Sequence, residues 1–206
     1  LVFVQSQSEL ALPDYMSDIV TNGIQSGGFG TSVSEVLSEE TYNHLLIFAG
    51  EDKKVIINAY EYKESFDVNI ENDFPNLDQG YQLKDLTDEE EDVLESALIK
   101  PMIMVSSIDS MDPSSDEFIQ KFGHLPDGVS VYDVLSMMNE ETINTMLESV
   151  NTQMETMGES TLKIAAGNGV KAEYIKLGCD VDAVQTKYIV TSGLKMLGIP
   201  LIGTIA

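Results

Sequence analysis

The 206-residue sequence contains no arginine and no tryptophan, and it has only one cysteine and two histidines. Proteins that bind nucleic acid or anionic lipid headgroups through charge need clustered basic side chains, and this chain has eleven lysines against 35 acidic residues. A single cysteine, Cys179, excludes an internal disulfide and a cysteine-cluster zinc site. The sequence therefore excludes nucleic acid as a partner and predicts a fold that is held together without such crosslinks.

The residues that enzymes use for catalysis are equally scarce. His44 and His124 are 80 positions apart, and Cys179 has no basic residue beside it, so no nucleophile, base and orienting group can be assembled. The sequence has no G-x-x-x-x-G-K-[ST] phosphate loop, and we interpret the glycines at 167–169 as a break in a helix. The acids at Asp109, Asp112, Asp116 and Glu117 have the wrong spacing for an EF-hand. We expect a chain that is not an enzyme and that binds no cofactor or metal of its own.

The negative charge is concentrated in the middle of the chain. The net charge is −24, and residues 25–160 alone carry 29 acidic side chains and six lysines, or −23. Residues 161–206 carry three acids and five lysines. Because 43% of the residues are hydrophobic, we expect a folded core and not a disordered polyanion.

Both ends of the sequence are apolar and begin or stop abruptly, so we expect a fragment of a longer protein. Residues 188–206 form an apolar run that is long enough for a membrane span, although Lys195 and Pro200 interrupt it. A buried core helix is the alternative for this run. Residues 1–24 show apolar spacings of three and four, which predict a helix kinked at Pro13 and ended by Asn22-Gly23. We interpret residues 27–30, which are Gly-Gly-Phe-Gly, as a flexible linker.

The middle block predicts a mainly α-helical domain made of short helices. Each begins at a residue whose side chain can accept a hydrogen bond from the first helical turn, and the candidate caps are Ser38, Thr87, Ser130, Asn139 and Asp180. Residues 61–86 lack helical periodicity, and the alternation of Phe66, Val68 and Ile70 predicts a short strand or an extended loop. Residues 102–108 follow Pro101 and can continue a helix or form a strand.

Two surface features allow a functional and a structural interpretation. The acidic run Asp88, Glu89, Glu90, Glu91 and Asp92 is a candidate patch for a cationic ligand, but acids in a first helical turn also offset the helix dipole. The methionines can line an adaptable hydrophobic groove or simply fill the core; those concerned are Met137, Met138, Met146, Met154 and Met157.

The two ends resemble the same protein family. Residues 18–24, which read DIVTNGI, resemble the outer end of the first transmembrane helix in bacterial ABC exporters of the multidrug type. The C-terminal segment is similar to the start of the second transmembrane helix in the Gram-positive branch of that family, through Leu177, Gly178, Asp180, Gln185, Tyr188, Ile189, Gly193, Met196 and Leu197.

This resemblance implies a division into three parts. Residues 1–24 are then the outer end of one transmembrane helix and 177–206 the start of the next, the two packing antiparallel as a stalk. Residues 25–176 are then an acidic helical domain outside the cell, which agrees with the lack of arginine in outer loops. ATP and Mg²⁺ belong to a nucleotide-binding domain that this chain does not contain.

The same resemblance implies the cell membrane as the location and a second half-transporter subunit as partner. The domain would gate or cover the outer exit during export of a drug, lipid or peptide, or recognise a substrate there. Its acidity favours cationic peptides or drugs. The alternative is a soluble or surface-anchored α-helical protein that binds cationic ligands and whose apolar tail is part of its core.

Overall fold

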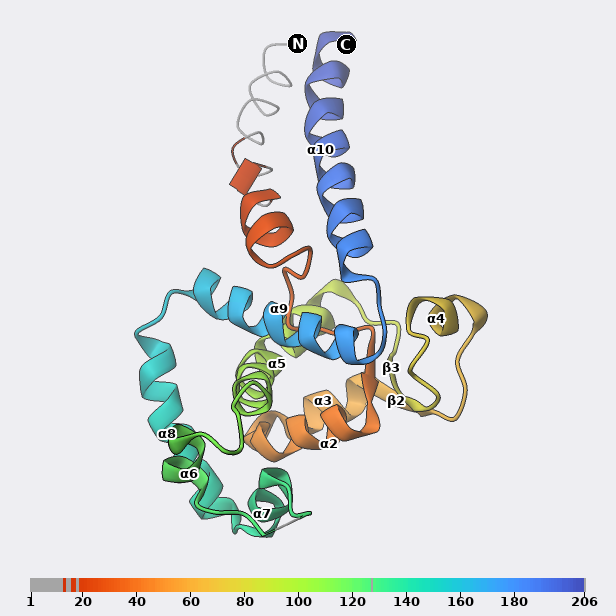
Figure 1. Ribbon diagram of the computed structural model, residues 1–206. Coiled ribbons are helices and arrows are strands. Elements are labelled where there is room, and N and C mark those ends of the chain that lie inside the picture. The colour runs from red at the N-terminus through yellow and green to blue at the C-terminus, as the bar shows by residue number, and fades with distance from the viewer. Residues whose placement is uncertain (1–12, 14–15, 18, 127, 206) are drawn as a thin grey trace.

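The computed structural model describes residues 13, 16–17, 19–126 and 128–205 and has a globular body with a helical stalk (Figure 1). The fold is mainly helical with one small sheet, as we expected. In chain order the elements are a π-helix η1 (Ile19–Gln25), β1 (Val36–Ser38), α2 (Glu39–Phe48), a 3₁₀ turn η2 (Gly50–Asp52), α3 (Lys53–Ala59), β2 (Tyr60–Lys63), α4 (Val68–Asp73), β3 (Gly80–Leu83), α5 (Asp88–Asp109), α6 (Asp116–Phe122), α7 (Val131–Met137), α8 (Glu140–Glu155), α9 (Glu159–Lys176) and α10 (Val181–Ile205).

The sheet is antiparallel in the order β1-β3-β2, with Tyr81 of β3 paired to Leu37 on one side and to Tyr62 on the other. Strands β2 and β3 fall at the two ends of residues 61–86, for which we predicted a short strand or an extended loop. The alternation at 66–70 was nevertheless misleading, because α4 begins at Val68. The Asp67 carboxylate accepts hydrogen bonds from the backbone N–H groups of Asn69 and Ile70. This N-cap stabilises the first turn of a helix at residues where the alternation indicated a strand.

Helix α5 is the centre of the core and packs against α2, α3 and α9. Its buried residues Leu94, Leu98, Met102 and Val105 recur at spacings of three and four, the pattern of a helix face turned to the core. Pro101 does not end α5, which continues to Asp109, so residues 102–108 are helical and not a strand.

The predicted helix break at 167–169 was wrong, because α9 runs unbroken from Glu159 to Lys176. These glycines serve close packing. A β-carbon at Gly167 would overlap the carbonyl oxygen of Phe29, and one at Gly169 would lie 2.6 Å from Cγ of Met102. The glycines therefore allow α9 to approach both α5 and the segment that follows η1.

That segment, residues 26–30, is packed against the body, whereas we predicted a flexible linker at residues 27–30. Phe29 is buried, and its ring meets that of Tyr174 edge-on with centroids 5.4 Å apart. Gly28 has a φ of 91°, a backbone conformation that residues with a β-carbon rarely adopt. It also approaches the backbone of Gln185 closely. The connection between stalk and body is thus fixed by contacts.

A buried carboxylate joins α9 to the start of α2. Glu173 is 2% exposed, and its Oε1 accepts hydrogen bonds from the backbone N–H (2.8 Å) and the hydroxyl (2.6 Å) of Ser38. Its Oε2 accepts a bond of 2.6 Å from the Thr41 hydroxyl. Because a charge in the interior is costly unless it is bonded, these three donors explain why the carboxylate is tolerated there.

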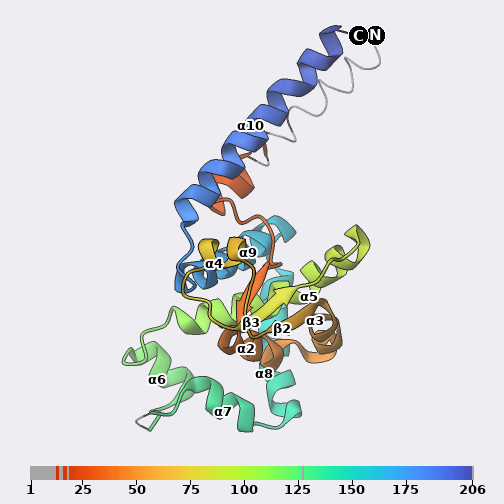
Figure 2. The same ribbon diagram turned by 90° about the vertical axis from the view of Figure 1, so that its right-hand side faces the viewer.

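Helices α6, α7 and α8 form a lobe, residues 112–126 and 128–157, that we call the α6–α8 lobe. In two views at right angles α6 and α7 lie at the end of the body away from the outer end of α10 (Figures 1 and 2). Helices α7 and α8 begin at the capping residues that we predicted. The Ser130 hydroxyl accepts a hydrogen bond from the N–H of Asp133, and the Asn139 side chain accepts one from the N–H of Thr142.

Candidate functional site

The stalk consists of η1 and α10, which lie side by side. Gln185 on α10 donates a hydrogen bond from Nε2 to the carbonyl oxygen of Gly23, at 2.8 Å. A β-carbon at Gly23 would lie 3.0 Å from Cγ1 of Ile189, whereas one at Gly28 would lie 3.0 Å from Cα of Gln185. Gly23 therefore lies beside Ile189, whereas Gly28, later in the sequence, lies beside the earlier residue Gln185. The two segments thus run antiparallel.

Helix η1 continues to Gln25 and does not end at Asn22-Gly23 as we predicted. Its wider turns are visible in the bond from the N–H of Ser26 to the carbonyl oxygen of Thr21, five residues back. Of residues 1–18 the structure describes only 13, 16 and 17, so the residues on both sides of Pro13, on which the predicted kink depends, lie outside the described part of the chain.

The stalk exposes apolar side chains in two stripes. Met16, Val20 and Ile24 follow one another at intervals of four, and Ile24 is 59% exposed. Val190 and Leu194 on α10 show the same interval, with Leu194 65% exposed. Exposed apolar surface of this kind is characteristic of contact with another protein or with lipid. In the part of the chain that the structure describes, no helix reaches the combination of length and hydropathy that a membrane span requires.

The acidic run at residues 88–92 lies in the first turns of α5, and all five side chains are exposed. Because consecutive residues point around the helix, they do not share one face. Glu90 is occupied by the cap: its carboxylate accepts from the N–H and hydroxyl of Thr87, and these bonds lower the pKa of Glu90. Asp88, Glu91 and Asp92 face a shallow hollow of about 310 Å³ together with Glu95. The role of the run in binding cations stays a prediction.

The two histidines, which are distant in sequence, line one cavity of about 710 Å³. The His44 ring stacks on that of Tyr132, with centroids 3.4 Å apart, and is half-buried. The Tyr132 hydroxyl donates to Asp109 Oδ1 at 2.7 Å, and Lys176 Nζ donates to Asp109 Oδ2 at 2.5 Å. Tertiary contact, which sequence spacing does not reveal, brings these groups together.

The charges in this cavity are largely balanced by one another. Burial lowers the pKa of His44, and the nearby carboxylates of Glu40 and Asp109 oppose that shift only in part. Burial is the largest influence on the pKa of Lys176 and acts to lower it, but the hydrogen bond to Asp109 together with the charges of Asp109, Glu173 and Glu40 outweighs burial and raises the pKa. Across the described residues, no group of three or more His, Cys, Asp or Glu side chains is arranged to hold a metal ion.

A second cavity, of about 520 Å³, lies between the α6–α8 lobe and helices α2 and α5, is partly open to solvent and is lined mainly by apolar side chains. We call it the apolar cavity. Its polar lining residues are Ser107 and Lys121, and its other walls come from α2, α5, α6, α7 and α8 with the residues that follow α5 and α8. The apolar lining residues are Phe48, Ile103, Met104, Ile108, Met111, Phe122, Leu135, Ile143, Leu147, Val150, Met154 and Met157.

Of the two interpretations of the methionines, a hydrophobic groove or the core, the groove applies to part of the set. Met154 and Met157 line the apolar cavity, joined by Met104 and Met111 from α5 and its end. Met138 is half-buried against the core, and Met137 is 86% exposed and contributes to neither a core nor the cavity. The side chain of Met146 lies outside what the structure describes. Only the spacing of Ile143, Leu147, Val150 and Met154 signals this site in the sequence.

The single cysteine is a free thiol with no catalytic partner. Cys179 is half-buried at the turn between α9 and α10, and burial together with the charges of Asp73, Asp180 and Glu35 raises its pKa. A thiol with a raised pKa is a poor nucleophile at neutral pH. Its position agrees with our interpretation of Cys179 as unreactive.

Comparison with family models, with curated proteins and with solved structures gave no match to this chain. Its function is therefore argued from the stalk and from the cavities of the body.

Proposed function

We propose that this chain is the extracytoplasmic part of a permease subunit in a bacterial multidrug-type ABC exporter, located between the first two transmembrane helices. The observation that carries the proposal is the pairing of η1 with α10. The chain enters and leaves the body side by side and antiparallel, with a direct bond from Gln185 to Gly23. A domain placed in the outer loop between two neighbouring helices must have its ends together in this way.

The chemistry of the stalk supports the same function. Its apolar stripes, represented by Ile24 and Leu194, are exposed in the isolated chain and need apolar neighbours. Neighbouring transmembrane helices or the other half of the transporter would supply them. The segments that form the stalk are also those whose sequences resemble the two helix ends of the family.

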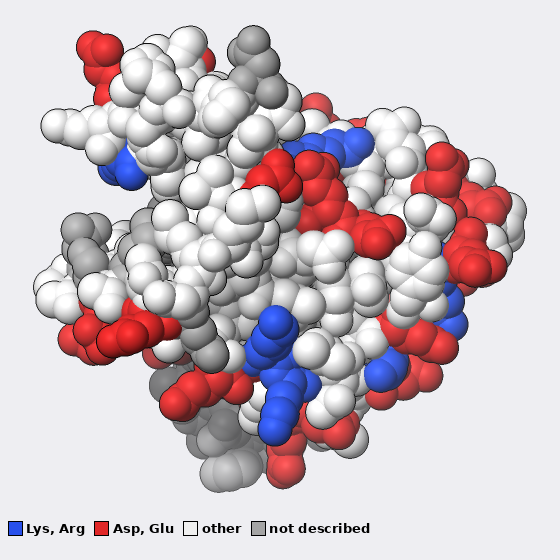
Figure 3. Space-filling model, turned by 90° about the horizontal axis from the view of Figure 1, so that it is seen from below, with Lys and Arg blue, Asp and Glu red and all other residues white. Residues whose placement is uncertain are grey.

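The charge of the body supports the proposed location outside the cell. Acidic side chains occur in several groups on the face opposite the stalk, and lysines are few there (Figure 3). The chain has no arginine, which is the pattern of segments that cross the membrane outward. In this proposal the body gates or covers the outer exit or recognises a cationic substrate. ATP hydrolysis occurs in a nucleotide-binding domain elsewhere in the complex.

Sidedness can be tested in cells that express the complete subunit. In a Cys179→Ala background, Ser65→Cys places a thiol in an exposed loop between β2 and α4. We expect a membrane-impermeant maleimide to label this thiol in intact cells. Labelling only after the cells are permeabilised would place the body inside the cell and overturn the proposal.

Participation in transport can be tested by replacing residues 26–175 with a short Gly-Ser linker. The two stalk helices stay connected in this variant, so we expect it to insert in the membrane but to lose export of cationic compounds. Unchanged export would exclude an essential role for the body in gating or recognition.

The apolar cavity favours a second candidate, a surface-anchored helical binding protein for cationic ligands. Extraction of the membranes with alkaline carbonate distinguishes the two. An exporter subunit stays in the membrane pellet, whereas a protein attached only at the surface is released.

A further inference from the structure

The apolar cavity has the size and lining of a ligand site. Its volume is about 520 Å³, whereas an engineered apolar cavity of about 150 Å³ is already large enough to bind benzene. Pockets that bury drug-sized ligands have volumes of roughly 300–1,000 Å³ and are lined mainly by apolar side chains. The cavity meets both conditions, since Ser107 and Lys121 are its polar members.

One wall of the cavity is the apolar face of α8. Ile143, Leu147, Val150 and Met154 follow one another at spacings of three and four, and all four line the cavity. The helix thus turns its apolar stripe toward a space that protein atoms do not fill. The cavity is partly open to solvent, so an apolar occupant would remove this stripe from water, which is favourable.

The charge around the cavity selects the class of occupant. Between residues 112 and 157 the sequence has nine acidic residues and one lysine. That lysine, Lys121, is paired with Glu117 at 2.8 Å, so the positive charge at the cavity is neutralised by its neighbour. Glu141, Glu148 and Glu155 form an exposed stripe along α8 itself. The electrostatic potential of this lobe therefore attracts cations and repels anions.

Aromatic rings in the lining strengthen this preference. Phe48 and Phe122 both line the cavity, and the face of an aromatic ring attracts ammonium groups, quaternary ones included. An ammonium headgroup can therefore bind at the cavity without a buried carboxylate.

We propose that the apolar cavity binds small hydrophobic cations, with the apolar body of the ligand against α5 and α8 and its ammonium group toward the acidic surface of the lobe. This site goes beyond the exporter function proposed above, because it belongs to the chain itself. It is tested on the purified 206-residue protein, so its failure and the failure of the exporter proposal are distinguishable.

The first test compares three ligands with the same ten-carbon chain by isothermal titration calorimetry, each below its micelle concentration. We expect decyltrimethylammonium to bind more tightly than neutral decyl maltoside, and decanoate to bind most weakly. The affinity of the cation should fall as salt increases, because salt screens its attraction to the acidic lobe. Binding of decanoate as tight as that of the cation, or no binding of the cation, would overturn the proposal.

Matched variants locate the site. Val150→Phe fills the cavity, and we expect it to weaken decyltrimethylammonium binding at least tenfold. Val93→Phe makes the same change at an exposed position of α5 outside the cavity and should leave binding unchanged. If both variants bind the cation as the parent does, the ligand binds elsewhere, for example on the stalk, and the proposal fails.

A charge variant separates the two parts of the ligand. Replacing Glu141, Glu148 and Glu155 by glutamine should weaken binding of the cation severalfold and leave that of decyl maltoside unchanged. Hydrogen exchange gives an independent readout that does not depend on the folding of any variant. Amides of α8 should exchange more slowly when decyltrimethylammonium is added to the parent protein, and an unchanged exchange rate would contradict binding in this cavity.

Discussion

Gln185 on α10 donates a hydrogen bond of 2.8 Å to the carbonyl oxygen of Gly23 on η1, and this bond joins residues that are 162 positions apart. Gly23 allows the close approach, because a β-carbon there would lie 3.0 Å from the side chain of Ile189. The pairing of the two stalk helices therefore depends on a small residue on one helix and a long amide side chain on the other.

Gln185→Ala should loosen the stalk without unfolding the body. The change removes the donor to a partly buried carbonyl, which costs about 1 kcal/mol when the bond is lost. We expect faster hydrogen exchange in the first turns of α10 and unchanged exchange in α5. Gln120→Ala is the matched control, since Gln120 is exposed on α6. Equal exchange in both variants would mean that this bond does not hold the stalk together.

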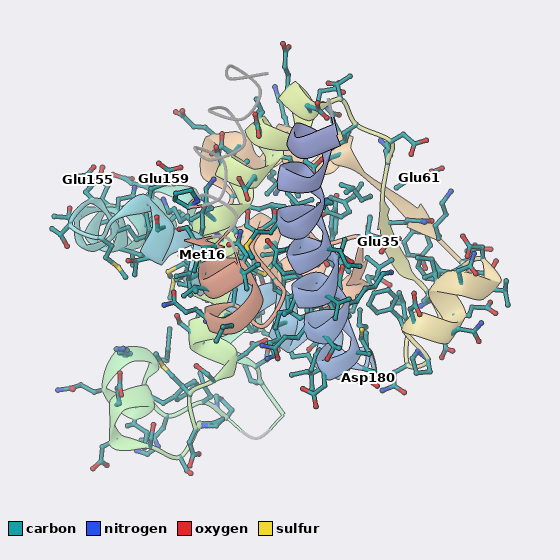
Figure 4. All side chains as sticks on the ribbon, turned by 90° about the horizontal axis from the view of Figure 1, so that it is seen from above. Met16, Glu35, Glu61, Glu155, Glu159 and Asp180 are labelled. Atoms are coloured by element: carbon teal, nitrogen blue, oxygen red, sulfur yellow. The ribbon has the colours of Figure 1, made fainter. Side chains whose placement is uncertain are left out.

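Glu173→Gln should destabilise the body. The glutamine side chain has one acceptor oxygen and one NH₂ donor group, where glutamate has two acceptor oxygens. Its NH₂ group would therefore face the N–H of Ser38 or the hydroxyl of Thr41, which are themselves donors. A buried group left without its partner costs about 1–3 kcal/mol, and we expect a loss of that size in urea unfolding. The exposed Glu159→Gln, at the joint between α8 and α9 (Figure 4), should change the unfolding free energy by less than about 0.5 kcal/mol. A similar small change for both variants would contradict the structural role of Glu173.

Gly167→Ala tests packing against helix propensity. Propensity alone predicts that alanine in the interior of a helix stabilises it by about 1 kcal/mol. The new methyl group would overlap the carbonyl oxygen of Phe29, so we expect destabilisation instead, by about 1–3 kcal/mol. Gly193→Ala provides the control within α10, because a β-carbon there meets no atom within 4 Å. A stabilising Gly167→Ala would show that α9 does not approach this segment closely.

The stability of the body should fall at mildly acidic pH because of His44. Its pKa is lowered in the folded state, chiefly by burial, so the unfolded chain takes up a proton first as the pH falls. The contribution of neutral His44 is complete above the unfolded pKa of about 6.5 and decreases below it. His44→Phe, which keeps a ring against Tyr132, should lose less stability than the parent between pH 7 and pH 5. Parallel curves of unfolding free energy against pH would contradict this prediction.

Features of the fold that depend on local chemistry were predictable from the sequence. Ser38, Thr87, Ser130 and Asn139 all cap helices as expected, because the cap and its partner N–H lie within three residues. Asp180 does the same at the start of α10. The mainly helical class follows from the same signals.

Features that depend on distant partners were not predictable. The glycines at 167 and 169 indicated a helix break because their neighbours Phe29 and Met102 are far away in the sequence. Strand β1 was missed for the same reason, since Leu37 is defined as a strand residue only by its pairing with Tyr81. Of the candidate sites, the acidic run was visible in the sequence. The apolar cavity is formed by residues of five helices, and the apolar stripe on α8 was the only part of it that the sequence indicated.

Because η1 and α10 leave the body side by side, the stalk joins the body at one end only (Figures 1 and 2). Helices α6 and α7 lie at the end of the body away from the stalk, and the segment after η1 is packed into the body through Phe29 (Figures 1 and 2). A rotation of the body about its junction with the stalk would therefore displace α6 and α7 farther than the residues beside the junction.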